Sequence, residues 1–99
     1  MEQTDNTVGL SRDLIIHPGE TLAEALEERN ITQSELAIRT GMTELYIEQV
    51  IKWQQDITSE FALKLEEAFG IESLFWMNLQ KNYDRELAAY MELHGLEHQ

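Results

Sequence analysis

The chain has 99 residues, 42% of them hydrophobic, which is enough for one compact domain with a modest core. It has no cysteine, so disulfide bonds and zinc sites made of thiolates are excluded, and we expect a cytoplasmic protein. No apolar run reaches the roughly 18 residues of a membrane span, and the first residues lack the pattern of a signal peptide.

The chain is strongly acidic: 7 basic residues face 19 acidic ones, and the formal net charge is −12. A field of this sign repels phosphate, which weakens nonspecific binding to nucleic acid. Most of the acidic residues lie in segments 20–28 and 60–72 and in the last predicted helix, and we interpret them as solvated helix faces. One proline, five glycines and short gaps between periodic segments predict an all-α fold.

We interpret residues 1–16 as a flexible N-terminal arm in front of one domain at residues 17–94. Residues 1–13 are polar and show no helical period. Residues 14–16 are apolar, and they pack either against the domain or against a partner.

The first helix is predicted to begin at Pro18 or Gly19. Proline suits the first helical position because its missing N–H would be unpaired there in any case. Leu22 and Leu26 give this helix a buried stripe, and Asn30 or its neighbour ends it.

Two short helices joined by a tight turn are predicted between Thr32 and Trp53. Thr32 and Glu35 form a T-x-x-E capping box, which starts the first of the two. Gly41 stops it, because glycine accepts a left-handed backbone without a Cβ penalty. Thr43 then caps the next helix.

The second helix of this pair has a narrow apolar stripe at Ile47, Val50 and Ile51. The two helices therefore share a core and cannot lie parallel, which is a helix-turn-helix pattern. Six residues of the second helix face outward and would meet DNA in a major groove: Glu44, Leu45, Tyr46, Glu48, Gln49 and Lys52.

A fourth helix is predicted after Thr58, which is a further N-terminal cap. Gly70 ends this helix as Gly41 ends the second. Its apolar positions recur at helical spacing: Phe61, Ala62, Leu65 and Phe69.

A fifth helix is predicted to follow a Ser73 cap and to run to about His94. Its apolar stripe is longer than a small domain needs: Leu79, Tyr83, Leu87 and Tyr90. Such a stripe indicates contact with a second copy or a partner helix, and packing back onto the first helix is the alternative.

Six short motifs occur along the chain: HPGE at 17–20, TQSELA at 32–37, IT at 57–58, ALKL at 62–65, FWMNLQ at 75–80 and NY at 82–83. Together they resemble the Xre/Cro-type helix-turn-helix family, and within it the HigA-type antitoxins, also called plasmid-maintenance antidote or virulence-associated proteins. The pairing of HPGE with FWMNLQ is the most specific part of this resemblance, which covers about residues 16–90.

The resemblance implies a five-helix fold like that of lambda repressor, with an extended C-terminal helix. It also implies a cytoplasmic homodimer that binds an operator in double-stranded DNA and represses an operon, often its own. A toxin protein, neutralised by direct contact, is the second implied partner. Such a transcription regulator of a toxin–antitoxin system is not an enzyme and needs no cofactor.

The resemblance also implies DNA-binding residues that contact phosphate. Gln33 and Ser34 match the start of the helix whose backbone N–H groups point at anions. Thr43 and Lys52 are the other two phosphate candidates.

Base contacts are implied for the first turns of the recognition helix, where Glu44, Leu45, Tyr46 and Gln49 lie. Gln49 is the best base reader, because a carboxamide pairs with adenine through two hydrogen bonds. Glu44 can accept a hydrogen bond from cytosine N4, and Leu45 can touch a thymine methyl group. The alternative for Leu45 and Tyr46 is a protein contact or the edge of the core.

The end of the recognition helix departs from the family pattern. Many relatives have an Asn-Gly-Lys turn where this chain has Lys52, Trp53 and Gln54. Trp53 is therefore either an anchor that packs this loop or an aromatic residue of an interface.

Two other functions remain open at this point. The acidic and apolar recognition surface is also suited to a protein-interaction module that binds a basic partner rather than DNA. In addition, the same family pattern heads longer chains that continue into a metallopeptidase, so the chain can be the regulatory segment of such a protein.

His94, Glu97 and His98 match the H-x-x-E-H zinc pattern. Zinc needs both imidazoles on one helical face, a third ligand and a shielded pocket, whereas here Gly95 interrupts the motif and no third ligand is evident. We predict no metal site and no catalytic residue. His17 is interpreted as a helix cap or a surface histidine.

Overall fold

The computed structural model describes residues 15–94, which form five α-helices and no strand. The helices are α2 (Pro18–Arg29), α3 (Gln33–Thr40), α4 (Glu44–Ile51), α5 (Ser59–Phe69) and α6 (Ser73–His94). The prediction of an all-α fold with five helices is confirmed over this range. Within the same residues, no helix is both long and apolar enough to cross a membrane.

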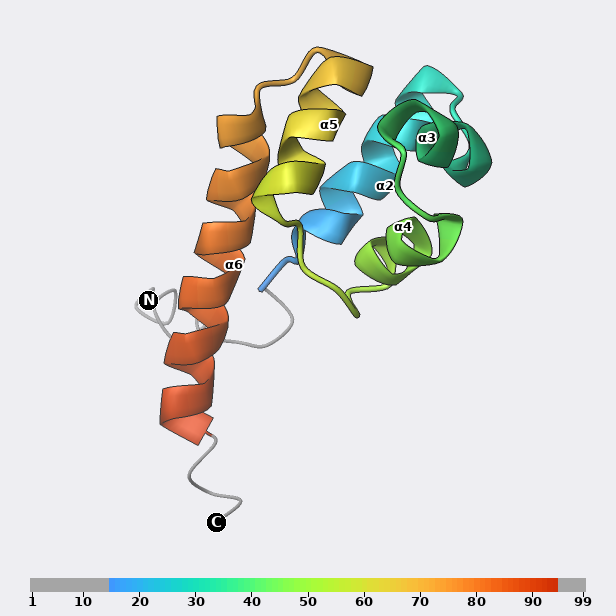
Figure 1. Cartoon of the computed structure of the whole chain (residues 1–99). Helices are drawn as coiled ribbons and strands as arrows, with labels where there is room; N and C mark the ends of the chain where they lie inside the picture. The colour runs from blue at the N-terminus through green and yellow to red at the C-terminus, as the bar shows by residue number, and fades with distance from the viewer. Residues whose placement is uncertain (1–14, 95–99) are drawn as a thin grey trace.

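The five helices pack around one core (Figure 1). α6 forms one side of the domain and packs on α5 and α2. α3 and α4 pack on each other at the other side, where α3 also contacts α5 and α4 contacts α2. The C-terminal half of α6 extends beyond the other helices.

Every helix contributes at least one fully buried apolar side chain to this core: Leu22, Leu36, Ile47, Val50, Phe61, Leu65 and Trp76. The apolar stripes predicted for α2, α4 and α5 all face it, with Ile51 and Phe69 half-buried at its edge. Burial of such side chains is the main favourable term in folding.

The long stripe of α6 is divided between the core and the surface. Tyr83 is buried and packs edge-on against His17 at the start of α2, with the ring centroids 4.7 Å apart. Three neighbours in the stripe are half-buried: Leu79, Leu87 and Tyr90. Met91 and Leu93, beyond them, are each 53% exposed. At Tyr83 the stripe thus packs back onto the first helix.

The predicted helix starts and stops are present. Thr32 forms a capping box with both bonds made, at 3.0 and 3.1 Å, and Thr43 and Thr58 cap α4 and α5 with their side-chain oxygens. Gly41 and Gly70 end α3 and α5 in the left-handed conformation, with φ of 73° and 77°.

The start of α6 differs from the expected one. Ser73 is the first residue of the helix rather than its cap. Its backbone N–H donates to the Glu66 carboxylate of α5 at 3.0 Å. A side chain from the neighbouring helix therefore satisfies one of the first N–H groups of α6, which have no partner within the helix.

The start of the packed domain also lies earlier in the chain than expected. Ile15 is only 1% exposed and Ile16 is 45% exposed, so the packed domain begins no later than Ile15, inside the range 1–16 that we assigned to the arm. The remaining part of the expected arm, residues 1–14, lies outside the described residues.

The HPGE segment brings α2 and α4 into close contact. Gly19 is buried at the start of α2, and a Cβ atom added there would lie 2.0 Å from the backbone oxygen of Val50. Such a distance is far inside van der Waals contact. Only glycine allows the start of α2 to approach the end of α4 this closely.

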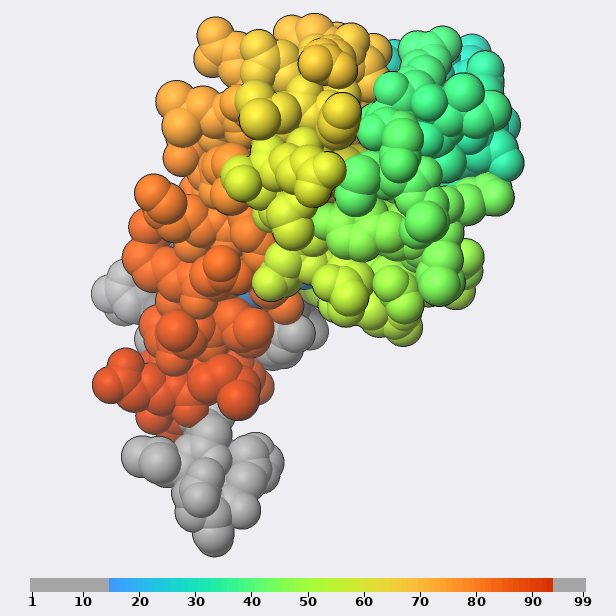
Figure 2. Space-filling model, in the orientation of Figure 1, coloured from blue at the N-terminus to red at the C-terminus, as the bar shows by residue number. Residues whose placement is uncertain are grey.

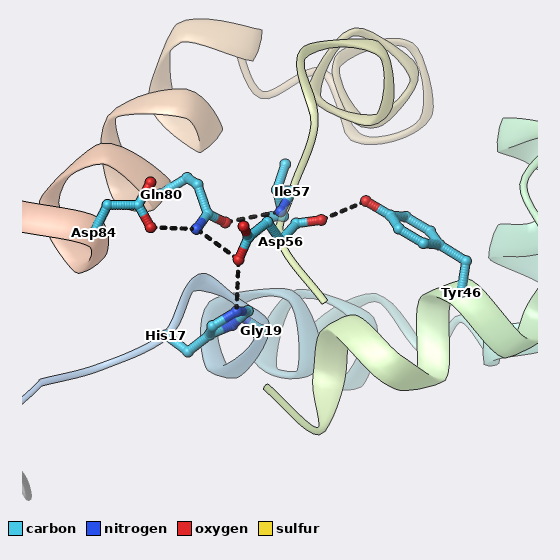
Figure 3. A network of polar contacts seen from close by, with 7 residues as sticks. All are labelled: His17, Gly19, Tyr46, Asp56, Ile57, Gln80 and Asp84. Carbon is cyan, nitrogen blue, oxygen red and sulfur yellow. Dashed lines mark hydrogen bonds and ion pairs between the residues drawn. The ribbon is translucent and has the colours of Figure 1, made fainter. Parts of the chain in front are cut away.

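A network of polar contacts fixes the loop between α4 and α5 (Figure 3). The side-chain oxygen of Gln80 accepts the Ile57 backbone N–H at 2.8 Å, and its amide nitrogen donates to the carboxylates of Asp56 at 3.1 Å and Asp84 at 3.0 Å. From the other side, the Tyr46 hydroxyl donates to the Asp56 backbone oxygen at 2.5 Å. The loop is thus attached to both α6 and α4.

His17 closes this network at the start of α2. Its Nδ1 accepts the Gly19 backbone N–H at 2.8 Å, so the cap interpretation is confirmed. Its Nε2 has no hydrogen-bond partner and lies 4.0 Å from the Asp56 carboxylate. The ring is buried and stacks on Trp53, with centroids 5.8 Å apart, so Trp53 packs the loop that follows α4.

Burial lowers the pKa of His17 below its ordinary value of 6.5, and the nearby Asp56 carboxylate opposes this effect only in part. Because the unfolded chain takes up the proton at a higher pH than the folded chain, protonation favours unfolding. The stability that neutral His17 provides is complete above about pH 6.5 and declines as the pH falls below it.

We expect the free energy of unfolding in urea to rise as the pH increases towards about 6.5 and to level off above it. The His17 ring should titrate by NMR with a midpoint below 6.5. His17→Asn keeps a side chain able to cap the helix but has no titrating ring, so its stability should vary less over this range. A midpoint at or above 6.5 for His17 would contradict this assignment.

Gly19→Ala is expected to lower the free energy of unfolding by at least about 2 kcal/mol, because the new methyl group forces α2 away from Val50. Urea denaturation measures this loss. Glu24→Ala, at an exposed position of the same helix, is the matched control and should change stability by no more than about 0.5 kcal/mol. Equal stability of the two variants would show that the close approach is not needed.

Candidate nucleic-acid interface

The helix pair α3 and α4 presents one continuous surface of the molecule. Residues 41–43 join the two helices, and the buried side of α4 carries Ile47 and Val50. The other side of α4 faces outward next to the start of α3. In Figure 2 the side chains of both helices, coloured teal to green, form one side of the domain. This is the geometry that lets a recognition helix enter a major groove.

Most of the predicted contact residues reach solvent on this surface. Five are exposed: Ser34, Thr43, Glu44, Leu45 and Lys52. Three are half-buried: Gln33, Tyr46 and Gln49. The eight residues therefore come from the first turn of α3, the start of α4 and the end of α4.

Tyr46 has its polar group directed into the domain. Its ring packs edge-on against Phe61 with centroids 5.1 Å apart, and its hydroxyl donates to the Asp56 backbone oxygen. Burial raises the pKa of Tyr46 above its ordinary value of 10. Tyr46 thus fits the alternative of a residue at the core edge, whereas Leu45, at 63% exposure, points outward.

Two of the candidate residues bind each other. The Ser34 hydroxyl donates to the Glu44 carboxylate at 2.5 Å, which joins the first turn of α3 to the first residue of α4. Thr43 caps α4, where its side-chain oxygen accepts the Tyr46 backbone N–H at 3.0 Å.

The cation of Lys52 is paired inside α4. Its Nζ lies 2.8 Å from the Glu48 carboxylate, and the two side chains are 58% and 45% exposed. An exposed pair of this kind contributes roughly 0–1 kcal/mol, so Lys52 can exchange Glu48 for another anion. From Thr32 to Trp53 the chain carries Arg39 and Lys52 against three glutamates, a net charge of −1.

Ile38 is a surface residue that our sequence analysis did not single out. It is 83% exposed on α3, more than any other large apolar side chain of the described residues. It follows Ser34 by four residues, so the helical period places the two on the same face of α3. The four-residue spacing from Ser34 is the feature of the sequence from which the exposure of Ile38 on this face could have been predicted.

Among residues 15–94 there is no group of three or more histidine, cysteine, aspartate or glutamate side chains that could hold a metal ion. Glu97 and His98 of the H-x-x-E-H motif lie outside the described residues, as does the side chain of His94.

Comparison with known proteins gives a family match and a curated relative. The model of the helix-turn-helix family, described as "Helix-turn-helix", matches residues 22–76. Virulence-associated protein I of Dichelobacter nodosus is 34% identical over 74 residues, which cover 74% of this chain and 68% of that protein.

Solved structures of similar sequence share the fold. A putative antidote protein of a plasmid maintenance system from Nostoc punctiforme is 32% identical and has a TM-score of 0.78. The match covers 84% of this chain and 91% of that protein's chain. The antitoxin HigA of Pseudomonas aeruginosa, solved with the higBA promoter, is 31% identical and has a TM-score of 0.72. The match covers 86% of this chain and 91% of that protein's chain.

Tyr46→Phe is expected to lower the free energy of unfolding by about 1 kcal/mol, because the hydrogen bond to the loop is lost while the ring stays in place. Urea denaturation of the variant measures the difference. Leu45→Ala, one residue earlier on the exposed face, serves as the control and should stay within about 0.5 kcal/mol of the original chain. A phenylalanine variant as stable as the original would mean that the hydroxyl does not brace the loop.

Proposed function

Since the chain belongs to the helix-turn-helix family, and within it to the HigA-type antitoxins, we propose that it is a sequence-specific DNA-binding repressor of an operon. The observation that carries this proposal is the exposed face of α4 beside the start of α3. The Pseudomonas aeruginosa antitoxin solved with promoter DNA has the same fold over 86% of this chain. We propose that the protein acts in the cytoplasm.

Gln33 and Ser34 begin α3, where the first backbone N–H groups of a helix have no partner within it. Those N–H groups suit a phosphate, and Thr43 and Lys52 flank the same surface at the two ends of α4. These four residues are our candidates for the contacts that position α4 on the duplex.

Gln49 is our main candidate for direct base reading. It is half-buried in the second turn of α4, so part of its surface remains accessible. A carboxamide can pair with N6 and N7 of adenine.

Electrostatic attraction contributes little to this binding. The overall charge is −12, and Lys52 is already paired with Glu48. We therefore expect a plot of the logarithm of the affinity against the logarithm of the salt concentration to have a negative slope of only a few units. Base contacts and a second copy of the chain must supply the remaining binding free energy. In a homodimer the two half-sites would lie about one helical turn apart.

A toxin protein is the second partner that we propose, because the relatives are named as antitoxins or antidotes. The charge of −12 suits a basic protein partner. The comparisons do not favour an interaction module without DNA binding or a segment of a metallopeptidase, since the matched relatives include one solved with a promoter.

The test is a selection from randomised duplex DNA with the intact protein at about 50 mM salt. We expect an inverted repeat to be enriched. Gln49→Ala should then weaken binding most at one base pair of each half-site, by a factor of about 5 to 100. Lys52→Ala should weaken binding to all sequences alike and reduce the salt dependence by about one unit.

Each variant is the control for the other, since one removes a base contact and the other a phosphate contact. Circular dichroism confirms that both are folded. If the folded protein enriches no sequence, the repressor proposal fails, and the search turns to a basic protein partner.

A further inference from the structure

The hydrogen bond between Ser34 and Glu44 is not needed for either helix to form. The capping box of α3 uses Thr32 and Glu35, and α4 is capped by Thr43. Both bonded side chains are exposed, so burial does not force the contact. At 2.5 Å it is nevertheless short, as is usual when an O–H group donates to a carboxylate.

The hydrogen bond from Ser34 fixes the position of the Glu44 carboxylate at the start of the recognition helix. Glu44 is the first residue of α4, where side chains of a recognition helix meet base edges. Glu44 Oε2 accepts the Ser34 hydroxyl, and Oε1 has no hydrogen-bond partner among residues 15–94. One oxygen is held by α3, which leaves the other to accept a further donor.

The second acid of the same helix face is in a different situation. Glu48 follows Glu44 by four residues, a spacing at which like charges repel. Its charge is compensated by Lys52 at 2.8 Å. Glu44 has no cation within ion-pair distance among the described residues, so it is the carboxylate of α4 with the most to gain from an external donor.

Duplex DNA offers this carboxylate a selective partner. A carboxylate only accepts hydrogen bonds and is repelled by phosphate, by guanine N7 and O6, and by thymine O4. Adenine N6 is a donor, but the acceptor N7 lies beside it. Cytosine N4 is the remaining donor, and it is the group with which glutamate pairs in the major groove.

We propose that Glu44 determines specificity by accepting a hydrogen bond from a cytosine amino group, and that Ser34 is the residue that positions its carboxylate. This inference rests on the proposed function and refines it. It gives Ser34 a role different from the phosphate contact considered above, because its hydroxyl proton is already donated to Glu44.

The test starts from the site selected by the original chain and uses four duplexes that differ only at the base pair affected by Glu44→Gln. Fluorescence anisotropy gives the affinity for each duplex. The original chain should prefer cytosine at this position by roughly tenfold or more. Glu44→Gln should shift the preference to adenine, because an amide supplies both a donor and an acceptor.

Ser34→Ala should reduce the preference for cytosine several-fold and change the affinity for the other three duplexes less than twofold. Ser34→Thr, which keeps the hydroxyl, should restore the preference. In a Glu44→Ala background, Ser34→Ala should have no further effect on discrimination. Glu24→Gln, at an exposed position of α2, is the matched control for charge: it should raise the affinity for all four duplexes slightly and leave their order unchanged.

The outcomes separate this inference from the proposed function. A selected site whose base preference survives Glu44→Gln overturns the inference alone. Equal weakening of all four duplexes by Ser34→Ala also overturns it, and would identify Ser34 as a phosphate contact. A folded chain that selects no site overturns both proposals. Circular dichroism of every variant shows whether the chain is folded in each case.

Discussion

The attachment of the loop after α4 to α6 is the interaction on which the proposed interface depends. Gln80 satisfies the backbone N–H of Ile57 and the carboxylate of Asp56 at the same time, and Tyr46 fixes the carbonyl of Asp56 from α4. Asp56 is bonded by Tyr46 of α4 and by Gln80 of α6, and Ile47 and Val50 of α4 are buried in the core, so a rotation of α4 would break the Tyr46 bond and displace core side chains. A rigid element of this kind would hold the proposed base-reading side chains in place before DNA binds.

The network also explains which features of the sequence were informative. HPGE and FWMNLQ carry the family resemblance, and they contribute His17, Gly19, Trp76 and Gln80, which pack or brace the scaffold. None of these side chains is on the outer face of α4. Residues that specify the scaffold therefore identify the family and its fold, whereas the base-reading residues that we propose lie outside these two motifs.

Local and distant contacts differ in how well they could be predicted. The caps at Thr32 and Thr43 join residues three apart, so their hydrogen bonds could be predicted directly from the sequence pattern. The bonds from Ser34 to Glu44 and from Ile57 to Gln80 join residues 10 and 23 apart. They depend on how the helices cross, which the periodicity of a single helix does not determine. For the same reason the inward direction of Tyr46 became evident only in the fold.

The turn that ends α4 shows how a departure from the family pattern is accommodated. Trp53 adopts a left-handed backbone with φ of 66°, a conformation that favours glycine and costs another residue roughly 1 kcal/mol. The stacking of its ring on His17 offsets this cost. Trp53 directly follows Lys52, so the position of this phosphate candidate depends on the packing of His17 as well as on α4 itself. Protonation of His17 adds its proton at Nδ1, the atom that accepts the Gly19 N–H, so it removes the cap of α2 at the ring on which Trp53 stacks.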